Sequence, residues 1–196
     1  QGWINTMDST TNVKGAGPYI AATVSGACNT LAVAPCCANV KIATFVNPGT
    51  FCVTSGGSAA PCSGTGSNLV DYMVVAGGGA GQDSDGPGAG AGGFRESPGT
   101  ASGSYSVSPL GAAPAVSLPV SAQGYSITVG AGGADTGGTG VGNDSIFSTI
   151  TSAGGAAGNP TTPGLGDGGS GSGGYAIGGA GGTGNTPPVN PPQGQN

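Results

Sequence analysis

The stretch that decides the fold is "LVDYMVVAGGGAGQDSDGPGAGAGGFRES", residues 69–97. It opens with an apolar run in which Val70, Tyr72 and Val74 fall on every second position. Alternation with a period of two predicts a β-strand. Nine glycines follow between residues 77 and 93, and a second short run begins after them. The chain must therefore fold a strand that leads directly into a glycine tract and a strand that leads out of it.

The same period of two recurs on both sides of this stretch. In "VKIATFV", Val40, Ile42 and Val46 share one face. Similar runs are "GTFCVTS", "GSYSVS", "SLPV", "YSITV" and "DSIFSTI". About seven short strands at this spacing predict an all-β fold, arranged as a β-sandwich or jelly roll with long glycine-rich loops. Because proline cannot donate a ladder hydrogen bond, Pro119 predicts an edge strand.

The glycines are concentrated in three blocks. Residues 77–93, 130–142 and 154–184 hold 31 of the 45 glycines in the 196-residue chain. Glycine loses more conformational freedom on folding than any other residue, so ordering these blocks requires many backbone hydrogen bonds. Polyproline II-type segments that bond laterally would provide them. Glycine does not occupy every third position, which excludes a collagen triple helix.

The charged residues exclude several classes of function. Lys14, Lys41 and Arg95 are the only cations in a chain of net charge −5. Binding of nucleic acid requires several cations on one face, so no nucleic-acid partner is expected. No apolar run is long enough to span a membrane. Histidine is absent, which removes the commonest general base and zinc ligand, so we expect no enzymatic activity, cofactor or metal centre.

Two motifs fit a binding site only in part. Gly88, Gly90 and Gly93 match the dinucleotide pattern G-x-G-x-x-G, but Pro98 prevents the helix that such a site needs. Asp83 and Asp85 resemble the first positions of a calcium loop, but the closing Glu of an EF-hand is missing. A solvated acidic loop is the simpler interpretation of these carboxylates.

Five cysteines lie in the first third of the chain and contain no C-x-x-C spacing. Cys52 and Cys62 flank a Gly/Ser/Ala turn that a disulfide would close, while buried free thiols are the alternative. The cysteines suggest a division into three parts. Residues 1–40 are expected to form an anchoring, cysteine-bearing segment, residues 41–184 a glycine-rich β domain, and residues 185–196 a Pro-rich linker or tail.

The ordered combination "VDYMVVAGGGAG", "GAGGFRES", "YSITVGAGG" and "NDSIFSTITSAGG" resembles a known family. It is similar to the glycine-rich domain of structural and tail-fibre-like proteins of tailed bacteriophages, many of them from marine bacteria. The opening "GWINTMDSTTNV" and the ending "GGTGNTPPVNPPQGQ" are also similar. The cysteine-bearing insert at residues 24–39 departs from the usual pattern, so its role is open.

The resemblance implies a position on the virion surface, in a tail fibre or on the capsid exterior. It implies binding to other virion proteins, a homotrimer, and a host surface glycan or outer-membrane protein as receptor. The glycine-rich loops are then the expected contact surface, with these candidate residues: Gly79, Asp83, Asp85, Asp135, Asp167 and Tyr175. A capsid decoration or head-fibre protein is the alternative, and an extracellular ice-binding or silk-like protein is a weaker one.

Overall fold

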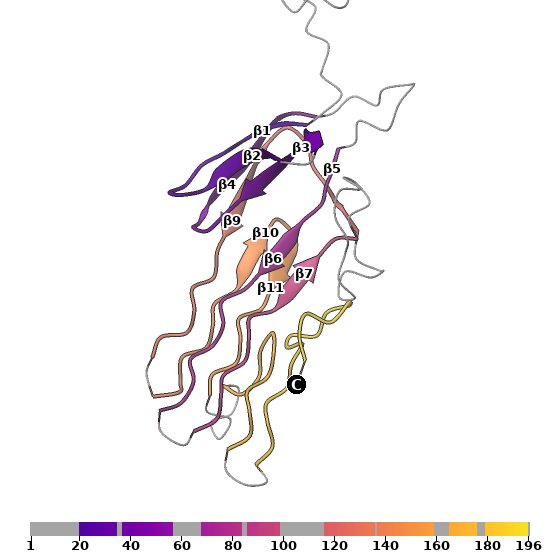
Figure 1. Ribbon diagram of the computed structural model, residues 1–196. Helices are drawn as coiled ribbons and strands as arrows, with labels where there is room; N and C mark the ends of the chain where they lie inside the picture. The colour runs from indigo at the N-terminus through magenta and orange to yellow at the C-terminus, as the bar shows by residue number, and fades with distance from the viewer. Residues whose placement is uncertain are drawn as a thin grey trace, which may run out of the picture.

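A computed structural model of the chain describes residues 20–34, 37–56, 68–83, 86–98, 116–135, 137–158, 165–175 and 179–195. These residues form short strands and no helix (Figure 1). The strands are β1 (Ala21–Val24), β2 (Thr30–Ala34), β3 (Cys37–Thr44), β4 (Gly49–Ser55), β5 (Leu69–Val70), β6 (Met73–Val75), β7 (Phe94–Glu96), β8 (Leu118–Pro119), β9 (Gly124–Thr128), β10 (Ser145–Phe147) and β11 (Ile150–Ser152). The predicted all-β class is confirmed, and the run "GSYSVS" lies outside the described residues.

The strands form one larger sheet and three small ones. The larger sheet has five strands in the order β1-β4-β9-β10-β11, and the pairs β2-β3, β5-β8 and β6-β7 form two-stranded sheets. Every pairing is antiparallel. β8 pairs only with β5 among the described strands, so Pro119 lies on an edge strand, as the sequence predicts. The sandwich or jelly-roll order stays a prediction.

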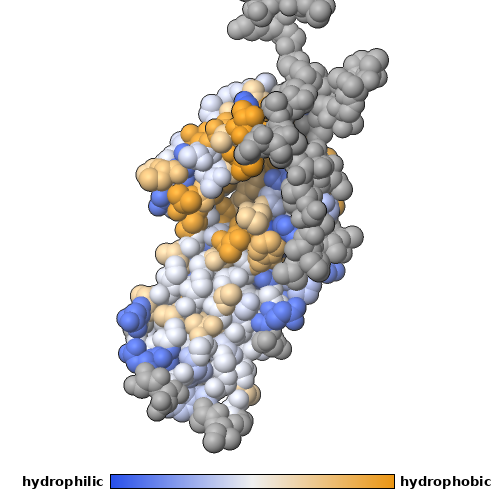
Figure 2. Space-filling view, viewed as in Figure 1, coloured by the Kyte–Doolittle hydropathy of each residue, from blue (hydrophilic) through white to orange (hydrophobic). Residues whose placement is uncertain are grey.

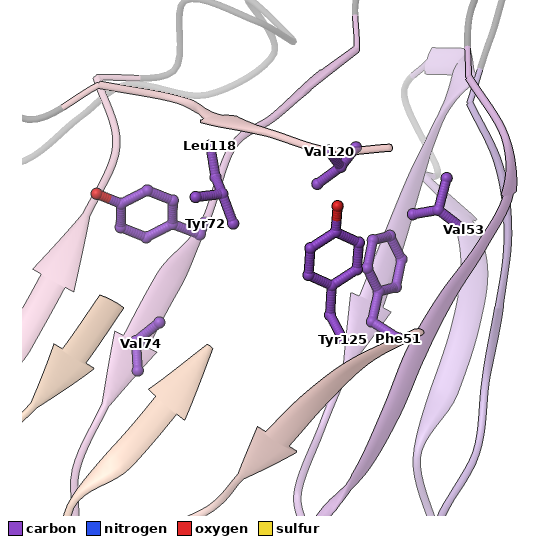
Figure 3. Close-up of a cluster of buried hydrophobic side chains, with 7 residues drawn as sticks. All are labelled: Phe51, Val53, Tyr72, Val74, Leu118, Val120 and Tyr125. Carbon is purple, nitrogen blue, oxygen red and sulfur yellow. The ribbon is translucent and has the colours of Figure 1, made fainter. Parts of the chain in front are cut away.

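A small apolar core joins the five-stranded sheet to the strands around β6. It consists of Phe51, Val53, Tyr72, Val74, Leu118, Val120 and Tyr125 (Figure 3). Phe51 lies directly opposite Tyr125 across β4 and β9. Phe147 on β10 meets the Phe51 ring edge-on at a centroid distance of 6.1 Å. Edge-to-face aromatic pairs are favourable beyond their buried area, so these rings hold β4, β9 and β10 in register.

The amino-terminal strands belong to the same folded unit as the strands that follow. β1 pairs with β4 and β2 pairs with β3. The predicted boundary at residue 40 therefore falls inside β3, although the three-part division itself stays a prediction. Within β3, Ala43 and the following Phe45 pack against the core, while Ile42 points to solvent. This is the alternation of faces predicted from "VKIATFV".

Long extended segments run from the strands toward the opposite end of the molecule (Figure 1). We call them the glycine bundle, made of residues 76–82, 87–93, 130–134, 139–143, 153–158, 165–174 and 179–183. They belong to no strand ladder, yet backbone hydrogen bonds link each of them to its neighbours. β6, β9 and β11 lead into segments of the bundle, and β7 and β10 begin where segments end. The sheets therefore determine where each glycine segment starts or ends.

Hydrogen bonds in the bundle repeat every three residues. Segment 76–82 bonds to segment 87–93 through Ala76 N–H to Gly93 O and, three residues later, Gly79 N–H to Gly90 O. It bonds to segment 139–143 in the same way, through Gly77 N–H to Asn143 O and Ala80 N–H to Gly140 O. A third pair runs into it, Gly155 N–H to Gly77 O with Gly158 N–H to Ala80 O. A β-strand would present the same edge at every second residue, whereas polyproline II has three residues per turn. The bundle is thus the polyproline II-type packing that the sequence predicts.

The segment at residues 153–158 lies in the interior of the bundle. Its backbone bonds to segments 76–82, 87–93, 139–143 and 165–174, so it has neighbours on several sides. Ala156 and Ala157 have no exposed surface. A segment surrounded in this way can hold only glycine and alanine, because any larger side chain would enter a neighbouring backbone.

Many bundle glycines lack room for even one methyl group. A Cβ at Gly79 would overlap the carbonyl oxygen of Ala156, and one at Gly142 would overlap that of Gly77. In contrast, a Cβ at Gly81 or Gly88 would meet nothing within 4 Å. Close approach of neighbouring backbones therefore requires glycine at some positions of the tract and not at others.

The Pro-rich end packs onto the domain as far as residue 195. Gln193 is 1% exposed, and its side-chain Oε1 accepts a hydrogen bond from Ala153 N–H at 2.8 Å. The Phe94 N–H donates to the Gln193 backbone oxygen. Asn185 organises this loop, since its Oδ1 accepts from the N–H groups of Val189 and Gln193. These contacts join the end of the chain to β7 and to the start of segment 153–158.

Replacing Gly79 by alanine tests the close approach in the bundle. We expect Gly79→Ala to lower the free energy of unfolding by about 2 kcal/mol or more, because the new methyl group must displace the Ala156 backbone. Gly88→Ala is the matched control, and we expect stability between unchanged and about 1 kcal/mol higher. Chemical denaturation of both variants measures the difference, and equal stabilities would contradict the packing.

Replacing Gln193 by alanine tests the attachment of the Pro-rich end. The change leaves the buried Ala153 N–H without its acceptor, so we expect a loss of about 2 to 3 kcal/mol in unfolding free energy. Gln195 has an exposed side chain two residues later, and Gln195→Ala should change stability by less than about 0.5 kcal/mol. If calorimetry gives the same melting temperature for both variants, the Gln193 side chain does not hold this end in place.

Candidate recognition surface

The end of the bundle farthest from the sheets is formed by residues 81–83, 86–87, 134–135, 137–139, 158, 165, 174–175 and 179, which we call the tip turns (Figure 1). Hydrogen bonds close to these residues place them at the same level. They run from Gly158 N–H to Ala80 O, from Ala80 N–H to Gly140 O, and from Gly173 N–H to Gly88 O. Residues that are far apart in the sequence therefore form one end surface.

Two of the tip turns pack directly against each other. Gln82 lies close to both Gly86 and Gly138, where an added Cβ would be 2.5 Å and 2.7 Å from the Gln82 Cβ. Gly138 has a φ of +84°, a conformation that glycine adopts without steric cost. The Gln82 Oε1 is buried and has no hydrogen-bond partner among the described residues. Contact through Gln82 fixes residues 81–83 and 86–87 relative to residues 137–139.

Three of the predicted contact residues lie in tip turns. Asp83 and Asp135 are exposed, and they belong to the two turns that meet at Gln82. Tyr175 is 46% exposed at the same end of the bundle. Asp85 lies outside the described residues. The structure thus brings two carboxylates and one aromatic ring to the same end of the molecule.

Two other predicted contact residues lie elsewhere. Gly79 is inside the bundle, where its N–H donates to Gly90 O at 3.0 Å. Asp167 lies in segment 165–174, and its Oδ1 accepts from Thr183 N–H at 2.6 Å. Both residues hold neighbouring segments together in this structure, and their role in receptor contact stays a prediction.

The predicted disulfide involves one described residue. Cys52 is a half-buried free thiol on β4, opposite Thr23 on β1 and Gly124 on β9. Cys62 lies outside the described residues, so the bridge stays a prediction. Cys28 is an exposed free thiol with a φ of 60° in the turn between β1 and β2.

The sheet end of the molecule has a different surface. Figure 2 shows apolar residues gathered over the sheets, residues in the middle of the hydropathy scale over the glycine bundle, and a group of hydrophilic residues at its tip. The large apolar side chains exposed at the sheet end include Val33, Ile42, Val46, Met73 and Val75, with exposures from 49% to 67%. The alternation in "VKIATFV" predicts that Val40, Ile42 and Val46 share one face, but it does not predict that Ile42 and Val46 remain exposed among the described residues.

Neither a metal site nor a membrane span is found in the part of the chain that the structure describes. No three His, Cys, Asp or Glu side chains there are grouped so that they could hold a metal ion. No helix of sufficient length and apolarity to cross a bilayer occurs among the same residues.

The comparison with protein families gives one match. The glycine-rich domain family matches residues 51–196, which include the core strands from β4 onward, the whole glycine bundle and the Pro-rich end. No curated protein matches the chain, and neither does any solved structure. Since the match covers well over half of the sequence, this chain belongs to the glycine-rich domain family.

Proposed function

We propose that this chain is a non-enzymatic surface module of a tailed bacteriophage particle that recognises the host cell, as a receptor-binding or tail-fibre module. The observation that carries the proposal is the division of the molecule into two ends. Exposed apolar side chains lie on the sheets, and exposed polar turns lie at the tip. The phage origin comes from the resemblance of the strand and glycine segments to tail-fibre-like proteins.

The tip suits recognition because the bundle segments next to it are held together. Hydrogen bonds from Ala80 to Gly140 and from Gly173 to Gly88 fix these segments close to the tip turns. A surface that is ordered before it binds loses less conformational entropy on binding. The tip turns themselves lie at the end of the glycine bundle, and surface loops of this kind tolerate changes of sequence. A receptor that presents hydroxyl groups or cations, such as a host glycan or an outer-membrane protein, complements the exposed carboxylates of Asp83 and Asp135.

The sheet end suits attachment to the particle. Exposed apolar patches on soluble proteins commonly mark contact surfaces. Val33, Ile42 and Val46 are each at least 50% exposed and lie on β2, β3 and the turn that follows β3. We assign this face to contacts with other virion proteins and with further copies of the chain in a homotrimer. With only Lys41 and Arg95 as cations among the described residues, nucleic acid is not a partner in this proposal.

Attachment through the sheet end also fits a capsid decoration or head-fibre protein. Immunogold labelling of virions distinguishes the two roles. We expect label at the tail tip or fibres, where adsorption to the host begins. Label spread over the head would replace host recognition with decoration, and no label on any particle would refute a virion role.

Replacing the exposed side chains of the tip tests host recognition. We expect the triple variant Asp83→Ser, Asp135→Ser, Tyr175→Ser to lose at least tenfold in binding of the fluorescently labelled chain to host cells, because these side chains face solvent at the tip. Stability should change by less than about 1 kcal/mol, since none of them is buried.

The matched control variant is Ile42→Ser at the opposite end, where the side chain is 50% exposed. It should bind cells as well as the unmodified chain and should instead weaken assembly into trimers or onto particles. Loss of cell binding in the Ile42 variant combined with full binding in the tip variant would exchange the roles of the two ends.

A further inference from the structure

A surface pocket of about 370 Å³ opens beside the core, on the sheet side of the molecule. Segments distant in sequence provide its lining. The residues that matter for its chemistry are Tyr72, Arg95, Ser117, Leu118, Ile150 and Asn190. Small-molecule sites usually measure about 300 to 1,000 Å³, so this pocket has room for a small ligand. It lies apart from the tip turns and uses none of their residues.

Hydrogen bonds fix the walls of the pocket. The Asp71 Oδ1 accepts from the Ser97 hydroxyl at 2.8 Å and from the Ser117 hydroxyl at 2.6 Å. Ser97 also forms two hydrogen bonds with the Tyr72 backbone. The Ser97 N–H donates to the Tyr72 carbonyl oxygen, and the Ser97 Oγ accepts from the Tyr72 N–H. β7, β8 and the link between β5 and β6 are therefore joined next to the pocket. The walls have little freedom to rearrange when a ligand enters.

Arg95 gives the pocket a positive charge in a chain of net charge −5. Arg95 is the only Lys or Arg among the residues that line the pocket. Glu96 follows it on β7 and so points to the other face of the strand. Residues 98–116 and 185–196, which adjoin the pocket residues in sequence, contain no Asp or Glu. The Asp71 carboxylate next to the pocket accepts hydrogen bonds from Ser97 and Ser117, and no Asp or Glu is among the lining residues themselves.

Tyr72 contributes an aromatic wall next to this charge. Its ring packs in the core beside Leu118, and its hydroxyl points away from the other labelled side chains (Figure 3). Burial raises the pKa of Tyr72, and the nearby positive charge of Arg95 offsets part of that rise. Tyr72 and Arg95 line the same pocket, so both can contact one ligand.

We propose that this pocket binds a carboxylated sugar, with the carboxylate on Arg95 and the ring against Tyr72, Leu118 and Ile150. A guanidinium forms two parallel hydrogen bonds with one carboxylate. The carbon-bound hydrogens of a sugar ring pack on aromatic and aliphatic surfaces, and its hydroxyls require polar partners, which the Asn190 amide at the rim supplies. One cation matches one carboxylate, whereas a phosphate-bearing ligand usually requires several cations or a helix terminus.

Titration of the full chain with galacturonate, glucuronate and N-acetylneuraminate tests the proposal by ligand-observed NMR and calorimetry. We expect at least one of the three to bind, and its methyl ester to bind at least tenfold more weakly because the ester cannot form the paired bonds to Arg95. Arg95→Gln should weaken binding by at least tenfold, and Arg95→Lys should fall between, since lysine keeps the charge without the fork. Lys41→Gln removes a cation on β3 and should leave binding unchanged.

The outcomes separate this proposal from the proposed function. The tip variant at Asp83, Asp135 and Tyr175 should bind the sugar normally, even if it no longer binds cells. Binding of none of the three sugars, or equal binding of acid and ester, would overturn the proposal. Competition by inorganic phosphate as effective as that by the sugar would identify a general anion site and also overturn it. A melting temperature of Arg95→Gln equal to that of the unmodified chain confirms that the variant is folded.

Discussion

The structure depends on the direct contact of backbone with backbone inside the glycine bundle. Fixing one residue of backbone costs roughly 1 to 2 kcal/mol of entropy, and glycine loses the most. A hydrogen bond returns a net of about 0.5 to 1.5 kcal/mol. Since these magnitudes are similar, a glycine segment is ordered only when its N–H and C=O groups are satisfied and its neighbours are already in place. The three-residue repeat provides this, because it directs bonds from one segment toward several neighbours.

The sheets bring those neighbours together. β6, β9 and β11 each lead directly into a bundle segment, and β7 and β10 each follow one. Rings at Phe51, Tyr125 and Phe147 hold three strands of the larger sheet in register. A change of register by one residue in a strand would shift the glycine segment attached to it, and a required glycine would then be replaced at its contact by alanine. The small apolar core thus sets the register of a bundle that has almost no side chains of its own.

The sequence predicts the strands and the type of glycine packing because both follow from local patterns. Alternation gives the strands around Tyr72, Ile42 and Tyr125, and the excess of glycine without a collagen repeat favours polyproline II-type segments. It does not predict which glycines are essential, because Gly79 and Gly88 have similar sequence surroundings and differ only in the backbone that faces them. The Pro-rich end was predicted as a linker or tail. Its packing depends on one buried side chain, Gln193, whose partners are 40 and 6 residues away.

The sequence predicts the location of the tip residues but not the pocket around Arg95, again because only local patterns can be recognised in a sequence. Asp83 and Asp135 interrupt glycine tracts, so their location in turns could be inferred from the sequence. The pocket around Arg95 could not, because its lining comes from β7, β8, the turn between β10 and β11 and the Pro-rich end, and no sequence spacing relates them.

The interior of the bundle has no room for functional side chains, since a methyl group already overlaps a neighbouring backbone at Gly79 and Gly142. Side-chain chemistry is therefore restricted to the bundle surface, the tip turns and the sheet end. Sequence changes at the tip can alter its exposed side chains without disturbing the glycine bundle that supports them.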